Sequence, residues 1–271
     1  MGRMQNSMAL AKASWQVLRE DKKLTLLPLM SFLATLVVIA SFALPAFVIG
    51  NNGVAAAGWV LAFVGYVVLA FVVVFFNAAL VWAADRRLSG ETVTIGQALH
   101  AASERTHVLL PWALVSATVS IVLRMIESRG VIGRIVGAIA GVAWSVVTFL
   151  VLPILVFEGI GPIAAVKRSG ELFKRTWGEN LIVNAGIGLV AMVAVLVGLV
   201  PVIALIALGG VFTVAGIVVG AVWFLGVSLV ASTLTGILQI ALYRFATGRD
   251  VPGFDRASLG AAFRARSRSY L

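Results

Sequence analysis

Residues 54–84 read VAAAGWVLAFVGYVVLAFVVVFFNAALVWAA, an apolar segment without a single charged residue. A helix that crosses a bilayer needs about 20 apolar residues, and this segment is longer. Backbone groups in lipid must find hydrogen-bond partners within the protein, which restricts spanning segments to helices or closed barrels. The apolar residues here do not alternate with the period of two that a barrel strand needs. The segment therefore predicts a transmembrane helix.

Five other segments have the same character and complete a set of six predicted spans. They lie at about 24–49, 108–125, 132–157, 181–208 and 211–245. The whole chain of 271 residues is 61% hydrophobic and 12% charged, whereas soluble domains average about 45–50% apolar and about 25% charged residues. We therefore predict an all-α polytopic membrane helix bundle that forms a single integral membrane domain over residues 1–271.

Basic residues are distributed unequally between the two ends of the predicted spans. They gather in the N-terminal segment, in the connections after 54–84 and 132–157, and in the tail 246–271, whereas the connection after 108–125 has few. The positive-inside rule then places both termini and the basic tail in the cytoplasm of a multi-pass protein of the bacterial inner membrane. The net charge of +10 has this cause, and we expect no nucleic-acid partner because no recognition module is visible.

Three of the basic segments also predict amphipathic helices at the cytoplasmic interface. Their apolar residues recur at helical spacing before the first, third and fifth spans: Met4, Met8, Ala11, Trp15 and Leu18; Ile95, Leu99 and Ala102; Ile163, Val166, Phe173 and Trp177. Such helices lie in the interface or pack on the bundle, and both can hold at once. The residues expected to contact anionic lipid are Lys12, Lys22, Lys23, Lys167, Arg168, Lys174 and Arg175.

Short motifs recur along the chain. Lys12-x-Ser14-x-x-x-Leu18 is similar to Lys167-x-Ser169-x-x-x-Phe173, and Ser89-Gly90 after the second span is similar to Thr247-Gly248 after the sixth. These parallels predict a threefold repeat of an interfacial helix followed by a helical hairpin. Internal repeats are common in transporters, and they also occur in membrane proteins that transport nothing.

Several motifs together resemble a known family. They are Pro153-Ile-Leu-Val-Phe-Glu158-Gly159-x-Gly161-Pro162, the following Lys167-Arg168-Ser169, the opening Ser14-Trp15-x-x-Leu18, and Tyr243-Arg-Phe-Ala246-Thr247-Gly248 near the end. The chain resembles an uncharacterised bacterial family of six-span integral membrane proteins, domain of unknown function 6159. The resemblance covers nearly the whole chain and implies the six-span fold. It implies no catalytic or ligand-binding residue.

One group of side chains has metal-ligand chemistry. His100, Glu104 and His107 share one face of a predicted helix, and imidazole with carboxylate can bind zinc or iron. A solvated polar face is the favoured interpretation, because the chain has no further histidine and no cysteine. We therefore predict no metal site and no cofactor.

The connection between the third and fourth spans is the exception to the charge distribution. At this outer end of the two spans, the charged residues are Arg124, Glu127, Arg129 and Arg134. This outer charged cluster could receive an anionic headgroup or substrate. The favoured alternative is an Arg124–Glu127 pair with snorkelling arginines at the end of a hairpin.

Other residues in the spans predict helix packing. Small residues that allow close helix contact, within the chain or between protomers, are Gly133, Gly137, Gly141, Gly216 and Gly220. The deepest polar residues, expected to form interhelical hydrogen bonds, are Asn77, Asn184 and Gln239. Pro45 and Pro201 are expected to kink their helices.

The sequence contains no recognisable catalytic constellation, so we expect a non-enzymatic protein. The first hypothesis is an accessory or organising protein that engages anionic lipid and packs with partner helices, or with copies of itself. The second is a transporter or lipid-handling permease, which the repeats and the outer arginines favour. The third is a membrane-embedded enzyme acting on lipids, which would need ionisable side chains that converge at one interface.

Overall fold

The computed structural model describes residues 3–51, 55–177 and 186–260. Every regular element in these ranges is a helix, which confirms the predicted all-α class. The elements are α1 (Arg3–Glu20), a 3-10 helix (Lys22–Thr25), α2 (Leu26–Asn51), α3 (Ala55–Leu88), α4 (Ile95–Ser103), α5 (Thr106–Glu127), α6 (Gly130–Thr148), α7 (Val151–Phe157), α8 (Pro162–Trp177), α9 (Gly186–Ala207), α10 (Val211–Ala246) and α11 (Arg256–Gly260).

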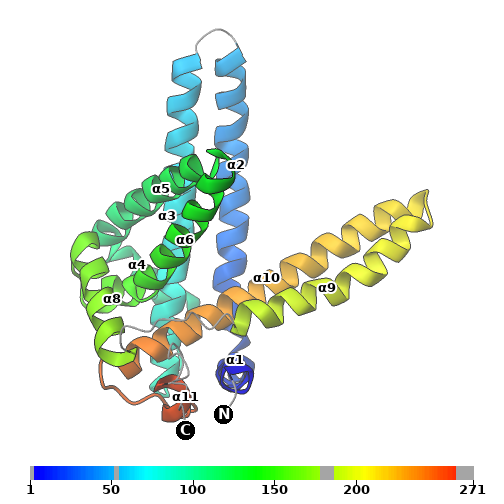
Figure 1. The fold of residues 1–271 in the computed structure, drawn as a ribbon. Coiled ribbons are helices and arrows are strands. Elements are labelled where there is room, and N and C mark those ends of the chain that lie inside the picture. Colours follow the sequence, from blue (N-terminus) through cyan, green and yellow to red (C-terminus); the bar gives the residue numbers. More distant parts are fainter. Residues whose placement is uncertain (1–2, 52–54, 178–185, 261–271) are drawn as a thin grey trace.

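The long helices form three hairpins that diverge from a common base (Figure 1). The pairs are α2 with α3, α5 with α6, and α9 with α10, and each pair is in direct contact. The short helices α1, α4, α7, α8 and α11 gather at the base, beside the ends of α3 and α10. The first and last described helices therefore lie at the same end of the molecule.

Five helical segments are long and apolar enough to cross a membrane. They are Lys22–Ile49, Ala56–Leu88, Thr106–Glu127, Gly130–Phe157 and Val211–Ala246. The fifth predicted span, 181–208, begins in residues outside the described ranges, and its apolar part Met192–Ala207 is shorter. The count of six spans stays a prediction. Helices α2 and α9 continue through Pro45 and Pro201.

The buried core lies at the base rather than along the hairpins. In α3 the side chains of Ala78, Leu80 and Ala84 are fully buried, and in α10 the same holds for Ile237 and Ile240. Toward the hairpin tips, apolar side chains face outward; Trp59 is 77% exposed, Ile132 78% and Val211 76%. Apolar surface on this scale marks a site of contact with a membrane or a protein.

The predicted fourth span is divided by a break between α6 and α7. Pro153 has no N–H, so it cannot donate the usual helical hydrogen bond to the carbonyl of Phe149, four residues earlier. The side-chain amide of Gln239 in α10 donates to this carbonyl. The interhelical hydrogen bond predicted for Gln239 is therefore confirmed.

The other two deep polar residues behave differently. The amide of Asn77 donates to the carbonyl of Val73, 2.9 Å away in its own helix. The predicted interhelical bond is therefore wrong for Asn77, because an i−4 carbonyl is within reach of its side chain. Asn184 lies outside the described residues.

Replacing Gln239 with leucine should destabilise the junction between α10 and the break, because the Phe149 carbonyl loses its donor. Polar contacts between membrane helices contribute about 0.6 kcal/mol on average and up to about 1.7. We expect a loss in the upper part of this range, measured by thermal unfolding in detergent. Thr235→Val, which removes a hydroxyl bonded to Ala231 in its own helix, is the control. Equal losses in the two variants would contradict this role of Gln239.

Several features at the base are found in more than one of the three predicted repeat units. A short helix, α1, α4 or α8, precedes each hairpin. Ser14 and Ser169 are both fully buried, and neither hydroxyl has a hydrogen-bond partner among the described residues. The hairpins end at Gly90, Gly159 and Gly248, with φ of 81°, 65° and 76°, values that glycine adopts without strain. The threefold repeat itself stays a prediction.

Candidate anion-binding site

A buried ion pair joins the base ends of α3 and α10. Arg244 Nε donates to Asp85 Oδ1 at 2.6 Å, and both side chains are more than nine-tenths buried. Arg244 Nη2 donates to the Asp85 carbonyl at 2.9 Å and to the Ser89 hydroxyl, while Nη1 donates to the Asp250 carbonyl at 3.3 Å. One guanidinium group thus fixes two helix ends and the segment that follows α10.

A cavity of about 1110 Å³ opens beside this ion pair. Its walls come from α1, the end of α3, the end of α10 and the segment after α10. Four arginines and two carboxylates line it: Arg19, Arg87, Arg244, Arg249, Glu20 and Asp250. The cavity lies where α3 and α10 end, at the base of two segments long enough to span a membrane.

Charges in the cavity wall are only partly neutralised by neighbours. Arg244 is paired with Asp85, Asp250 is 2.6 Å from Arg256, and Arg87 is 3.9 Å from Asp21. Among the described residues, no ion pair involves Arg19, Arg249 or Glu20. Guanidinium groups bind phosphate and carboxylate oxygens through paired hydrogen bonds. The excess of arginine therefore suits an anionic group.

The segment after α10 closes one side of the cavity. Its backbone turns at Gly248, and the amide of Arg249 donates to the Arg244 carbonyl at 2.8 Å. Phe254 is buried against the core. Asp255 accepts hydrogen bonds from the amide and hydroxyl of Ser258, both at 2.8 Å, and these bonds lower the pKa of Asp255. Local contacts thus hold the segment that presents Arg249.

The comparison with known families supports the resemblance found in the sequence. The model of a family of unknown function, DUF6159, matches residues 56–253. The chain belongs to this family. No curated protein and no solved structure matches it. In this DUF6159 protein, the matched region contains Asp85, Arg87, Arg244 and Arg249, whereas α1, with Arg19, precedes it.

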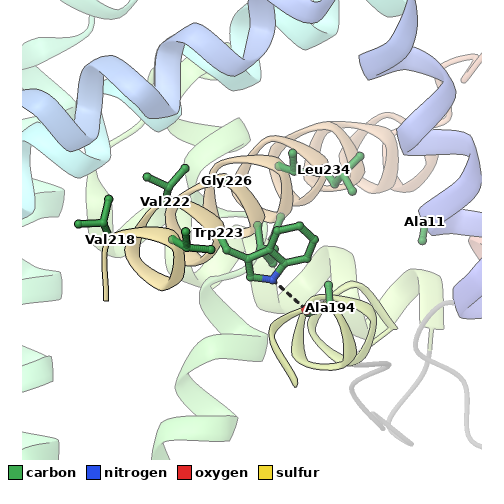
Figure 2. A pocket seen from close by; sticks show the side chains of 11 residues that line it. Ala11, Ala194, Val218, Val222, Trp223, Gly226 and Leu234 are labelled. Carbon is green, nitrogen blue, oxygen red and sulfur yellow. Dashed lines mark hydrogen bonds between the residues drawn. The ribbon is translucent and has the colours of Figure 1, made fainter. Parts of the chain in front are cut away.

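A second cavity in the DUF6159 chain, of about 640 Å³, is apolar (Figure 2). Val218, Val222 and Trp223 of α10 line it, with Ala194 of α9 and Ala11 of α1. The indole N–H of Trp223 donates to the Ala194 carbonyl at 3.0 Å and so ties α9 to α10. Gly198 gives the indole room, because a Cβ atom at this position would collide with it.

The predicted lipid-contact residues occupy two kinds of environment. Six of them have exposed side chains: Lys12, Lys22, Lys23, Lys167, Lys174 and Arg175. Arg168 differs, because its Nε lies 3.3 Å from Glu158, which also accepts the Tyr243 hydroxyl at 3.1 Å. The structure therefore gives Arg168 a partner within the protein that the sequence analysis did not anticipate.

Helix α1 has two apolar faces. Leu10, Val17 and Leu18 are buried against the base. Met8 is 56% exposed and Trp15 47% exposed, although both belong to the apolar face predicted from the sequence. Of the predicted face, Met8 and Trp15 are turned outward, whereas Leu18 packs α1 onto the protein together with Leu10 and Val17.

The three candidate metal ligands lie on an exposed surface at α4 and the start of α5. His100 Nε2 is 3.4 Å from Glu104 Oε1, and their side chains are 77% and 57% exposed. His107 Nδ1 faces the Glu104 backbone carbonyl instead, at 3.2 Å. Among the described residues, no group of three His, Asp or Glu side chains has metal-binding geometry.

The outer charged cluster lies at the tip of the α5–α6 hairpin, with Arg124, Glu127, Arg129 and Arg134 all exposed. Within the described residues, no ion pair joins Glu127 to these arginines. The Glu127 side chain lies instead over Gly137, where a Cβ atom would collide with it. The structure does not contain the predicted Arg124–Glu127 pair.

The five glycines predicted to allow close helix contact differ in how closely they are packed. A Cβ atom at Gly133 would collide with the Ile126 carbonyl oxygen, whereas one at Gly141 would meet nothing within 4 Å. At Gly216 and Gly220, a Cβ atom would lie 3.1 Å from the Val202 carbonyl oxygen and 3.2 Å from the Val202 side chain. Four of the five glycines therefore lie at close contacts within the chain.

Proposed function

We propose that this DUF6159 protein is a non-enzymatic protein of the bacterial inner membrane that binds anionic lipid headgroups at its base. It would serve there as an accessory or organising protein for other membrane components. In this proposal both termini are cytoplasmic, and the base lies at the inner surface of the bilayer. The observation that carries the proposal is the cavity at the span ends, whose arginines outnumber its carboxylates.

The physical basis is the negative potential of the cytoplasmic leaflet. Each lysine or arginine near that surface contributes about 1 kcal/mol of attraction to anionic lipid. Arg19 and Arg249 have no ion-pair partner among the described residues, so their guanidinium groups are available to a phosphate. The exposed lysines Lys12, Lys22 and Lys23 surround the same end of the molecule and add to this attraction.

The outward apolar faces support the organising role. On α1, Met8 and Trp15 are exposed. The apolar surfaces of the hairpins toward their tips are exposed as well. In a bilayer these surfaces are accessible to lipid chains and to the helices of a partner or a second copy. The organising role would be contradicted if the purified protein were monomeric in bilayers and no membrane protein were crosslinked to it in cells.

Replacing Arg19 and Arg249 together with glutamine should reduce the binding of anionic lipid. We expect retention of phosphatidylglycerol relative to phosphatidylcholine, measured by native mass spectrometry of the detergent-purified protein, to fall about tenfold. The wild-type preference should also weaken as ionic strength rises, because salt screens exposed charges.

The control for this experiment removes the same charge from the other end of the molecule. Arg124→Gln combined with Arg134→Gln changes two exposed arginines at the α5–α6 tip. This variant should keep the wild-type lipid preference. An equal loss in both double variants, or no preference for phosphatidylglycerol in the wild type, would refute headgroup binding at the base.

A further inference from the structure

A small crevice with both apolar and uncharged polar side chains in its wall lies between α2, α3 and α10, away from the basic cavity. It has a volume of about 230 Å³. Four hydroxyl groups and one amide line it: Ser31, Thr35, Asn77, Ser228 and Ser232. Because five uncharged polar side chains from three helices meet there without any ionised group, the crevice suits an uncharged ligand with hydrogen-bonding atoms.

The hydroxyl groups in this crevice lack the hydrogen bond to a carbonyl of the same helix that other serines and threonines of the long helices form. Ser41, Thr118 and Thr235 donate to carbonyls of their own helices at 2.7–2.8 Å. By contrast, no hydrogen bond joins the hydroxyls of Ser31, Thr35, Ser228 or Ser232 to another described residue. These four donors are therefore open to the acceptor oxygens of a ligand.

Each of these three helices changes from exposed to buried beside the crevice. Below it, toward the base, α2, α3 and α10 become buried, at Leu27, at Ala78 and at Thr233. Above it, toward the tips, the apolar side chains of α2 and α10 are largely exposed, and those of α3 are half-buried at 66–72 and mostly exposed beyond. Helix α3 is about 50 Å long and α10 slightly longer, which exceeds the ~30 Å hydrocarbon core. The level where exposed apolar surface gives way to buried core is thus the expected boundary of the hydrocarbon.

At that boundary a bilayer presents the glycerol ester groups of its lipids. Ester carbonyls are uncharged acceptors, which matches the four free hydroxyl donors. We propose that the crevice between α2, α3 and α10 is a binding site for the ester-bearing glycerol group of a membrane lipid. This site is distinct from the headgroup cavity, because it contains no charged side chain and depends on different residues.

The test compares two phosphatidylcholines that differ only in carrying ester-linked or ether-linked chains. The ether form keeps the headgroup and chains but lacks the carbonyl oxygens. We expect the wild-type protein to retain the ester form about five- to tenfold more than the ether form, since each hydrogen bond contributes about 1 kcal/mol. Native mass spectrometry of protein purified in detergent with equal amounts of both lipids gives the ratio.

Two variants then locate the preference. Combining Ser31→Ala, Ser228→Ala and Ser232→Ala should abolish it, while Ser41→Ala with Thr118→Val and Thr235→Val should leave it unchanged. Ser228→Ala alone, an exposed position, should lower the ratio without a loss of folding. Equal retention of ester and ether lipid by the wild type would overturn the proposal, as would an unchanged ratio in the triple serine variant.

A third arm distinguishes a lipid from a soluble ester. Triacetin, a water-soluble glycerol ester, should not displace the retained lipid. Complete displacement by triacetin would assign the site to soluble esters and would refute the membrane source. Because headgroup and charge are identical in the two phosphatidylcholines, failure here leaves the phosphatidylglycerol experiment unaffected.

Discussion

Arg244→Leu is expected to destabilise the protein by about 3–5 kcal/mol, because it leaves a buried carboxylate without its partner. The Asp85 side chain is only 9% exposed in the ion pair. The Ser89 hydroxyl and the Asp250 carbonyl lose a contact at the same time. Unfolding in detergent, followed by circular dichroism, measures the effect.

Two further variants isolate the cause. Arg249→Leu removes the same charge and volume from an exposed position close by, and it should change stability by less than about 0.5 kcal/mol. Replacing both Asp85 and Arg244 with leucine should recover much of the loss, because apolar pairs often substitute for buried ion pairs without cost. A double variant that is less stable than Arg244→Leu alone would argue against the uncompensated charge as the cause.

Gly133→Ala is expected to be the second most damaging change, at about 1–3 kcal/mol. The added methyl group would meet the Ile126 carbonyl oxygen, and a backbone atom cannot move aside as a side chain can. Helices α5 and α6 would have to separate at the tip of their hairpin. Thermal unfolding in detergent gives the magnitude.

A second glycine of α6 supplies the matched control. Gly141→Ala makes the same chemical change in the same helix, where nothing lies within 4 Å. Since alanine is favoured over glycine within helices by about 0.5–1 kcal/mol, this variant should be neutral or slightly more stable. If the two substitutions had the same effect, close packing at Gly133 would be refuted.

The positions of the long helices along the chain could be predicted from the sequence, because local composition decides them. Apolar runs such as 54–84 predict long helices without reference to their neighbours, and those helices are present. The break before α7 could have been predicted as well, because Pro153 removes one donor and Gln239 is a polar residue without another obvious role. Recognising the pair required knowing that α7 and α10 meet at the base.

The candidate site was harder to predict for the same reason. Asp85 and Arg244 each lie near the end of an apolar run, which is ordinary for charged residues. Only the packing of α3 against α10 makes them a buried pair. Likewise, Ser31, Asn77 and Ser232 are isolated polar residues in the sequence, and the crevice arises only where their three helices meet.

The Asp85–Arg244 pair also constrains the order in which the molecule can be made. The two residues are separated by 159 positions, so a ribosome makes the first two hairpins and nearly all of the third before it adds the arginine. Until then the buried ion pair cannot form. A nascent chain that stops before Arg244 therefore lacks the partner that pairs with Asp85 in the finished protein.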